Sequence, residues 1–345
     1  MTEFIGWTEV LHRVTAREDL TADEAEAAMA QVLAGEAEPV QLAAFIAALR
    51  TKGESVDEVA GMVDAMLAAA EPLDIPDVAI DIVGTGGSTR RRGNAVNVST
   101  MASFVAAAGG ATVCKHGNRK ASSSSGSSDL LEALGLTVEL SPAGVAICVN
   151  ELGLGFAYAR VFHPAMRHAG PVRAALGIPS VFNILGPLSH PGRITRQVIG
   201  VSTPELAPLV AGVLAQRRSP HGWVVHGSDG LDELTLGGAS TVWAVADGVV
   251  EELSVTPADA GLDQVAEGVI QGGGPERNAE LFHGLLAGDV GPVRDLVLLN
   301  AAAGLVVAGV VTDLAEGVRV GSDALEGGAV ERLYRRLVER TKQLA

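Results

Sequence analysis

From about residue 77 onward, short apolar runs alternate with helix-length segments, and this alternation constrains the fold more than any other feature of the chain. The apolar runs are VAIDIV, ATVC, QVIGV and GWVVHG, and the segments between them include MASFVAAAG, SSDLLEALG and PELAPLVAGVLAQR. Strands that are apolar along their whole length are buried on both faces, which is typical of a parallel sheet covered by helices. The sequence WAVADGVVEEL predicts a hairpin that turns at Asp247 and Gly248. We therefore predict an α/β fold with a mainly parallel central sheet flanked by helices.

The first 72 residues have a different pattern and predict a smaller all-helical domain. The segments AEAAMAQVLA, VQLAAFIAALR and EVAGMVDAMLAAA carry apolar residues at helical spacing. Thr21 with Glu24, and Ser55 with Glu58, fit capping boxes at helix starts. We expect these boundaries: a helical domain over residues 1–72, joined by helices from about 164–190, and an α/β domain over residues 73–345.

Composition and charge exclude several classes of protein. The chain has 345 residues and 48% hydrophobic content, enough for two packed domains. Its 25 lysines and arginines face 41 aspartates and glutamates, and the net charge of −16 repels nucleic acid and anionic membranes. No apolar run approaches the roughly 20 residues of a bilayer span, and MTEFIGWTEV lacks the order of a signal peptide. We therefore expect a cytoplasmic protein that has neither nucleic acid nor membrane as a partner.

Two glycine-containing basic loops follow strands of the predicted sheet. GTGG comes directly after VAIDIV, while KHGNRKASSSSGSSD, with Lys115, Arg119 and Lys120, begins at the end of ATVC. Glycines let backbone N–H groups approach an anion closely, because they lack Cβ and adopt positive φ. Loops at the carboxyl ends of neighbouring parallel strands face one edge of the sheet, where ligands of open α/β folds bind. GTGG alone also fits a plain tight turn, but the two loops together predict a polyphosphate site.

Five stretches, in this order, resemble the anthranilate phosphoribosyltransferase family: GTGG…NVST, KHGNR, GFAYARVFHPAM, VRAALGIPSVFNILGPLSHP and HGSDGLDE, over about residues 81–235. The resemblance implies a two-domain fold of the nucleoside phosphorylase and phosphoribosyltransferase class, usually homodimeric through its helical domain. It implies a pentosyltransferase that moves phosphoribose from phosphoribosyl pyrophosphate, the donor, to the amine of anthranilate, the acceptor. The reaction releases pyrophosphate, uses magnesium and serves tryptophan biosynthesis, with donor binding and catalysis in the α/β domain.

The resemblance also implies which residues form the site. Those expected to bind the donor are Gly84, Thr85, Gly86, Gly87, Ser88, Asn97, Val98, Ser99, Thr100, Lys115, His116, Gly117, Asn118, Arg119, Ser122, Ser123 and Ser127. Those expected to line the acceptor pocket are Gly84, His116, Asn118, Tyr158 and Arg173. Arg173 matches the arginine that holds the anthranilate carboxylate, a task suited to a planar cation.

The expected metal ligands are Ser99, Asp232 and Glu233, and two magnesium ions are expected. Hard oxygen ligands and few carboxylates suit a metal that shares the phosphates of its substrate. Apart from the resemblance, GLDEL fits an acidic surface turn. No residue is assigned as a general base, because an arylamine is neutral and already nucleophilic at pH 7. His163 and His168 are expected to be structural or pocket-wall residues.

Two stretches depart from the family pattern. The family's loop reads GTGGD followed by a few small residues, whereas here Ser88 replaces the aspartate and about three additional residues carry Arg90, Arg91 and Arg92. We expect one or more of these arginines to reach the pyrophosphate; the alternative is an exposed loop that pairs with the acidic surface. Arg160 follows Tyr158 and Ala159 where the family commonly has aromatic-Ala-Pro, which adds a cation to the acceptor side. Anthranilate is therefore the first expected acceptor, and another aminobenzoate of a specialised pathway is the alternative.

Two other classes of protein share this architecture. A non-catalytic relative that binds nucleic acid needs a basic surface, but the net charge of −16 and the intact LDE sequence argue against it. A nucleoside phosphorylase lacks the paired KHGNR and FNILGPL sequences. The phosphoribosyltransferase is therefore the expected function.

Overall fold

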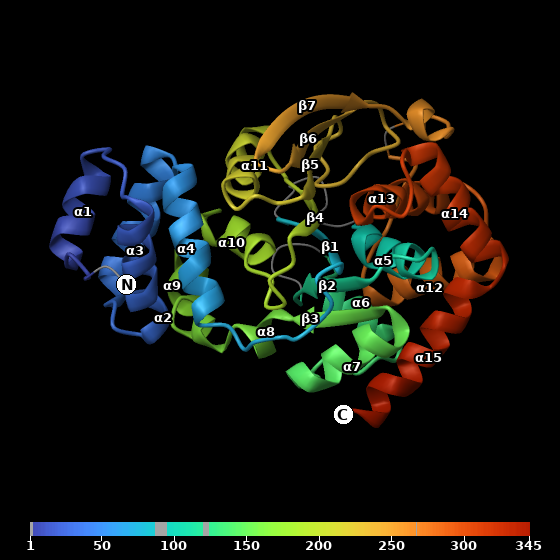
Figure 1. The fold of residues 1–345 in the computed structure, drawn as a ribbon, viewed down its shortest axis with the longest axis horizontal. Coiled ribbons are helices and arrows are strands. Elements are labelled where there is room, and N and C mark those ends of the chain that lie inside the picture. Colours follow the sequence, from blue (N-terminus) through green and yellow to red (C-terminus); the bar gives the residue numbers. More distant parts are fainter. Residues whose placement is uncertain (1–2, 87–94, 120–123, 267) are drawn as a thin grey trace.

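The computed structural model describes residues 3–86, 95–119, 124–266 and 268–345, and its central element is a seven-stranded sheet (Figure 1). The strands are β1 (Ile80–Gly84), β2 (Val113–Gly117), β3 (Leu154–Tyr158), β4 (Arg196–Gly200), β5 (His221–Gly227), β6 (Ser240–Ala246) and β7 (Val249–Val255). Their order is β3-β2-β1-β4-β5-β6-β7; β1 to β5 are parallel, and β6 pairs antiparallel with both β5 and β7. The predicted mainly parallel sheet is confirmed.

Strands β6 and β7 form the predicted hairpin. Ala246 pairs with Val249, and the two residues between them, Asp247 and Gly248, have φ values of 48° and 92°. A two-residue turn with positive φ at both positions matches the right-handed twist of the flanking strands. The sequence letters DG were therefore sufficient to locate this turn.

The predicted all-helical segment before the sheet is confirmed, and its described residues form α1 (Trp7–Thr15), α2 (Ala22–Ala34), α3 (Pro39–Lys52) and α4 (Val56–Ala68). Both predicted capping boxes form, because Thr21 and Glu24 exchange hydrogen bonds with each other's backbone N–H, as do Ser55 and Glu58. The Glu58 carboxylate is fully buried and also accepts hydrogen bonds from the backbone N–H of Leu20 and from the Lys52 ammonium. One carboxylate thus connects the start of α4 with the ends of two neighbouring segments.

Two hydrophobic cores lie on opposite faces of the sheet. On β4, Val198 belongs to one core and Ile199 to the other, and on β5 Val225 and Val224 divide in the same way. This two-sided burial explains why the strands are apolar at consecutive positions. The helices around the first core are α5 (Val98–Ala108), α6 (Ser127–Ala133), α7 (Pro142–Leu152), α12 (Pro275–Ala287), α13 (Pro292–Ala308), α14 (Leu314–Glu326) and α15 (Ala329–Gln343).

The second core extends from the sheet into the N-terminal helices. It contains residues of α10 (Phe182–Leu188) and α11 (Ala207–Gln216), and Figure 1 shows α1–α4 on the opposite side of the molecule from α12–α15. The remaining helices are α8 (Ala159–Phe162), α9 (Gly170–Leu176) and the short 3-10 turns η2 (Pro164–Arg167), η3 (Pro204–Leu206) and η4 (Pro257–Ala260). Helix α9 contacts α3, and α10 contacts α4. Within the described ranges, no single helix has the length and apolar composition of a membrane span.

Candidate functional site

Most of the site residues predicted from the sequence lie at or after the carboxyl ends of two neighbouring parallel strands, β1 and β2, and the acidic pair Asp232 and Glu233 follows β5. Strand β1 ends at Gly84, β2 at Gly117 and β4 at Gly200. Because the three strands are parallel neighbours, their ends lie at one edge of the sheet. These predicted or basic positions lie outside the described residues: Gly87, Ser88, Arg90, Arg91, Arg92, Lys120, Ser122 and Ser123.

The acidic loop after β5 crosses the ends of β1 and β4. Gly84 and Gly200 are paired in register, and a Cβ on either glycine would overlap atoms of Asp232. The Oδ2 atom of Asp232 accepts a hydrogen bond from the backbone N–H of Gly86 (3.0 Å). Asp232 and Glu233 are each only 6% exposed. The two glycines therefore provide the space that brings a buried carboxylate pair beside the glycine-rich loop.

Lys115 places a buried cation near these carboxylates. Its side chain is 3% exposed, and Nζ donates a hydrogen bond to a carbonyl oxygen of β1 (2.6 Å). Burial lowers the pKa of Lys115, while the charges of Asp81, Glu233 and Asp232 act in the opposite direction. Burial also raises the pKa of Asp81 to about 7, against the influence of Lys115. The charge of Lys115 therefore compensates part of the negative charge of this edge before any ligand binds.

The oxygen atoms of this edge fit a magnesium ion. Asp232 and Glu233 provide buried carboxylates, and Ser99, half-buried in the first turn of α5, provides a hydroxyl group. Within the part of the chain that the structure describes, no cluster of three or more His, Cys, Asp or Glu side chains would hold a metal unaided. Magnesium beside phosphates is commonly bound by one or two carboxylates together with water and substrate oxygen atoms, and the oxygen atoms of this edge suit that arrangement.

Asn97, at the end of the first phosphate loop (residues 84–97), and Ser125, in the second phosphate loop (residues 115–129), connect these two predicted loops. The Ser125 hydroxyl donates to Asn97 Oδ1 (2.8 Å), and Asn97 Nδ2 donates to the Ser125 carbonyl oxygen (3.3 Å). Asn97 is also the residue before α5, whose first-turn N–H groups have no acceptors within the helix. Such N–H groups favour an anion, and the helix dipole adds to this preference. The two hydrogen bonds between Asn97 and Ser125 thus hold the ends of the two loops together.

In the second loop, the neighbouring residues are packed closely. A Cβ on Gly117 would overlap the hydroxyl of Ser127, which donates a hydrogen bond to the Asn118 carbonyl oxygen (3.2 Å). The guanidinium of Arg119 forms two hydrogen bonds to the Glu132 carboxylate (2.9 and 2.7 Å). It also donates to the Tyr158 hydroxyl (3.1 Å) and lies 5.7 Å from the centre of that ring. In this conformation Arg119 is held by a carboxylate and not presented to an anion.

Arg173 and His116, both predicted at the acceptor pocket, contact the same side of α10. The Arg173 guanidinium lies 5.0 Å from the ring centre of Phe182, and His116 Nδ1 donates to the carbonyl oxygen of Gly186 (3.0 Å). Residues four apart lie on one face of a helix. Burial lowers the pKa of Arg173, and no carboxylate within the described ranges forms an ion pair with it. The site therefore contains a partly desolvated cation beside an aromatic ring, which suits an aromatic carboxylate.

Three histidines, His116, His163 and His190, pack together. The ring centre of His116 lies 5.2 Å from that of His163 and 5.6 Å from that of His190. Burial lowers the pKa of His163 to about 4 and that of His190 to about 3, and it lowers the pKa of His116 well below its usual value. All three rings are therefore neutral at pH 7. His168 lies elsewhere, against Gly35 at the end of α2.

Our sequence reasoning missed three residues that shape this edge. Gly200 gives space to the acidic loop, and Asn278 contacts the first phosphate loop. Asn300 exchanges two hydrogen bonds of 3.0 Å with the backbone of Leu234, directly after the two acidic residues. A polar residue within the apolar sequence LVLLNAAAGLVV was a visible signal for Asn300. Gly200 and Asn278 had no comparable signal, because their roles depend on contacts distant in sequence.

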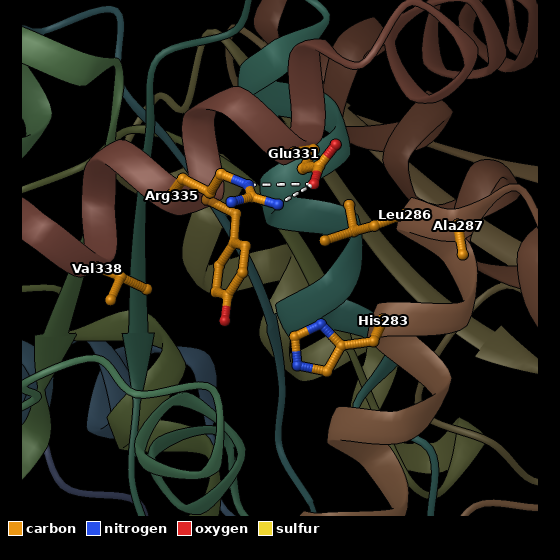
Figure 2. Close-up of a pocket in the computed structure, with 7 residues that line it drawn as sticks. His283, Leu286, Ala287, Glu331, Arg335 and Val338 are labelled. Atoms are coloured by element: carbon orange, nitrogen blue, oxygen red, sulfur yellow. Dashed lines mark hydrogen bonds and ion pairs between the residues drawn. The ribbon is translucent and has the colours of Figure 1, made fainter.

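A cavity of about 510 Å³ lies at the surface between α12 and α15 (Figure 2). Its lining residues are His283, Leu286, Ala287, Glu331, Tyr334, Arg335 and Val338. Arg335 forms an ion pair with Glu331 of the same helix (2.6 Å), so its charge is already compensated. The predicted site residues do not line this cavity, and we therefore place the candidate site at the strand ends.

Known protein families match both parts of the chain. Residues 8–70 match the helical bundle domain of the Glycosyl transferase family, and residues 76–330 match the a/b domain of the same family. The anthranilate phosphoribosyltransferase of a Nocardioides species is 47% identical over 340 residues, which cover 97% of this chain and 98% of that protein.

Solved structures match the whole fold. The anthranilate phosphoribosyltransferase of Thermus thermophilus has a TM-score of 0.89 and 44% identity, and the match covers 96% of this chain and 99% of that one. The enzyme of Saccharomyces cerevisiae in complex with PRPP and Mg has a TM-score of 0.88 and 27% identity, with 98% of both chains covered. Its complex with 4-fluoroanthranilate has a TM-score of 0.87 and 26% identity, with 98% of this chain and 99% of that one covered.

Proposed function

The chain belongs to the anthranilate phosphoribosyltransferase family, and on that premise we propose that its active site is the sheet edge where β1, β2 and β4 end. The enzyme transfers phosphoribose from phosphoribosyl pyrophosphate to the amine of anthranilate and releases pyrophosphate, a step of tryptophan biosynthesis. The observation that carries this placement is the glycine pair Gly84 and Gly200, which admits the buried carboxylate of Asp232 beside the Gly86 N–H.

We assign the donor to the two connected phosphate loops. The hydroxyl and amide groups of Asn97, Ser99 and Ser127 and the backbone N–H groups at the start of α5 are donors suited to phosphate oxygens. Magnesium, when bound by Asp232, Glu233 and the donor's oxygens, supplies positive charge for the departing pyrophosphate. We expect two ions.

We assign the acceptor to the pocket bounded by Arg173 and the neutral ring of His116. Arg173 binds the carboxylate and thereby fixes the position of the ring, so that the amine lies behind the sugar carbon that pyrophosphate leaves. Charge develops on the sugar and on the leaving group, and the polar groups of the edge are oriented for it before the reaction begins. The arylamine needs no strong base, and the lowered pKa values of the nearby histidines agree with this.

The test of the proposed function is a mass-spectrometric assay with phosphoribosyl pyrophosphate, magnesium and anthranilate. We expect phosphoribosyl anthranilate and pyrophosphate in equal amounts. The Asp232→Asn variant should fold but form product much more slowly. If the folded wild-type protein consumes neither substrate, the proposed function is wrong.

A second acceptor is favoured by one observation, the exposed cation Arg160 in α8, next to Tyr158 at the end of β3. No ion pair of Arg160 occurs within the described ranges, so its charge is available to a second carboxylate or a hydroxyl group on a substituted aminobenzoate. Steady-state assays with a panel of substituted benzoates test this. A clear preference for plain anthranilate removes the alternative.

Assembly and location also belong to the proposal. We expect a homodimer formed through the N-terminal helices, and a cytoplasmic location, as the family resemblance and the sequence predict. Light scattering during size-exclusion chromatography distinguishes a dimer from a monomer. Substitutions on the exposed faces of α1 and α3 should shift that equilibrium if the helices form the interface.

A further inference from the structure

Asn278 lies outside the five sequence stretches that first indicated the family, yet it contacts the first phosphate loop directly. It is the fourth residue of α12 and is fully buried. Its Oδ1 atom accepts a hydrogen bond from the backbone N–H of Asn97 (2.8 Å). Its Nδ2 atom donates to the carbonyl oxygens of Ala95 (2.9 Å), Gly273 (3.1 Å) and Gly274 (3.1 Å). One side chain thus binds four backbone groups from two distant segments.

The segment before α12, residues 271–274 with the sequence QGGG, reaches both phosphate loops. The backbone N–H of Gly273 donates to the Ala95 carbonyl oxygen (3.1 Å), and the Gly273 carbonyl oxygen accepts from the Ser124 hydroxyl (2.8 Å). A Cβ on Gly272 would overlap the backbone of Ala95. The QGGG segment can therefore approach the first loop only because it has no side chain at this position.

We propose that Asn278 is a positioning residue for the donor: it fixes the end of the first phosphate loop at residues 95–97 and, through Asn97 and Ser125, the second loop. The inference rests on the proposed function, because it assigns these loops to the donor. Buried backbone groups that lose a partner must move or remain unsatisfied, so loss of the Asn278 amide displaces the loops. Arg173, which we assign to the acceptor carboxylate, contacts Phe182 of α10 and is not bonded to Asn278. The effect should therefore fall on the donor.

The Asn278→Asp variant tests this with almost no change in side-chain volume. It keeps an oxygen that accepts from Asn97 but replaces the NH₂ group that serves three carbonyl oxygens. We expect the donor KM to rise about tenfold or more at saturating magnesium and anthranilate, since a ~1 Å misplacement costs up to about a hundredfold. The anthranilate KM should stay within about threefold of wild type.

The pH dependence of the same variant gives a second readout. A buried carboxylate that faces carbonyl oxygens is favoured in its protonated form, which again donates one hydrogen bond. The donor KM of Asn278→Asp, relative to wild type at each pH, should therefore fall as the pH is lowered from 8 to 6. A purely structural weakening produces no such recovery.

Two further variants keep the test decisive. Gly272→Ala disturbs the Ala95 segment sterically while leaving Asn278 intact, and it should also raise the donor KM selectively. Thr341→Val is the matched control, because Thr341 is a buried polar residue of α15 whose hydroxyl accepts from the backbone N–H of Thr137 (3.2 Å), a residue outside both loops. It should leave the donor KM unchanged. Thermal unfolding of each variant shows whether it is folded.

The outcomes separate this inference from the proposed function. A selective rise of the donor KM in Asn278→Asp or Gly272→Ala supports the positioning role. The role is overturned if the folded variants keep the donor KM of wild type, or if the donor and acceptor KM values rise equally. If calorimetry shows that the wild-type protein does not bind the donor at all, the proposed function fails, and the positioning role fails with it.

Discussion

Replacement of Arg173 by glutamine should weaken acceptor binding without weakening the fold. The guanidinium is half-buried, lies 5.0 Å from the Phe182 ring centre and has a pKa lowered by burial, so its charge is costly in the empty protein. Hydrogen bonds to charged groups contribute roughly 1.5–3 kcal/mol, and their loss corresponds to a rise of about 10- to 150-fold in the KM for anthranilate. Because a costly charge is removed, the free energy of unfolding should not decrease.

The assay is steady-state kinetics with each substrate varied in turn, together with urea unfolding. Arg173→Lys keeps the charge but loses the planar fork and the ring contact, so its anthranilate KM should lie between those of wild type and Arg173→Gln. Arg167→Gln is the control, since Arg167 is an exposed arginine of the adjacent η2 turn and the change in net charge is the same. A rise in the donor KM alone, or an equal effect of Arg167→Gln, would refute the assignment of Arg173 to the acceptor.

The remaining predictions concern the metal edge, the histidines and the arginine loop. Gly200→Ala should displace the Asp232 segment, raise the magnesium concentration needed for half-maximal rate and cost about 1–3 kcal/mol of stability; an unchanged magnesium requirement contradicts this. Burial lowers the His163 pKa to about 4 from 6.5, so the stability it contributes is present above pH 6.5 and is lost as the pH falls towards 4. Between pH 7 and pH 5 the wild type should therefore lose about 2 kcal/mol more unfolding free energy than His163→Asn, measured by urea titration. Replacement of the three arginines at positions 90–92 by alanine should raise the donor KM or the magnesium requirement. The matched control replaces three exposed arginines of α15 by alanine, namely Arg332, Arg335 and Arg336, and should alter neither quantity.

The sheet and the helices could be predicted because their signals are local. Consecutive apolar residues in QVIGV indicated a strand buried on both faces. Thr21 and Glu24 indicated a helix start because the two residues are only three positions apart and bind each other. The turn at Asp247 and Gly248 was equally local. Each of these features depends on residues within one element or one turn, so a single sequence contains enough information.

The shape of the site could be predicted only in part, because it depends on distant contacts. The sequence indicated the phosphate loops and the acidic pair, but Gly200 matters only because Asp232 crosses it, and Asn278 only because Asn97 lies 181 residues away. The family resemblance placed Arg119 among the donor-binding groups, whereas in the structure its guanidinium binds Glu132. Its role at the donor remains a prediction.

Calorimetric titration of the folded protein with phosphoribosyl pyrophosphate and magnesium tests most directly whether the sheet edge at the ends of β1, β2 and β4 binds the donor. We expect a measurable heat of association in the wild type and a large loss of affinity in Asp232→Asn, with the thermal unfolding temperature of the free variant close to that of wild type. Absence of binding by the folded wild-type protein, or equally tight magnesium-dependent binding by Asp232→Asn, would contradict the placement of the active site at this edge.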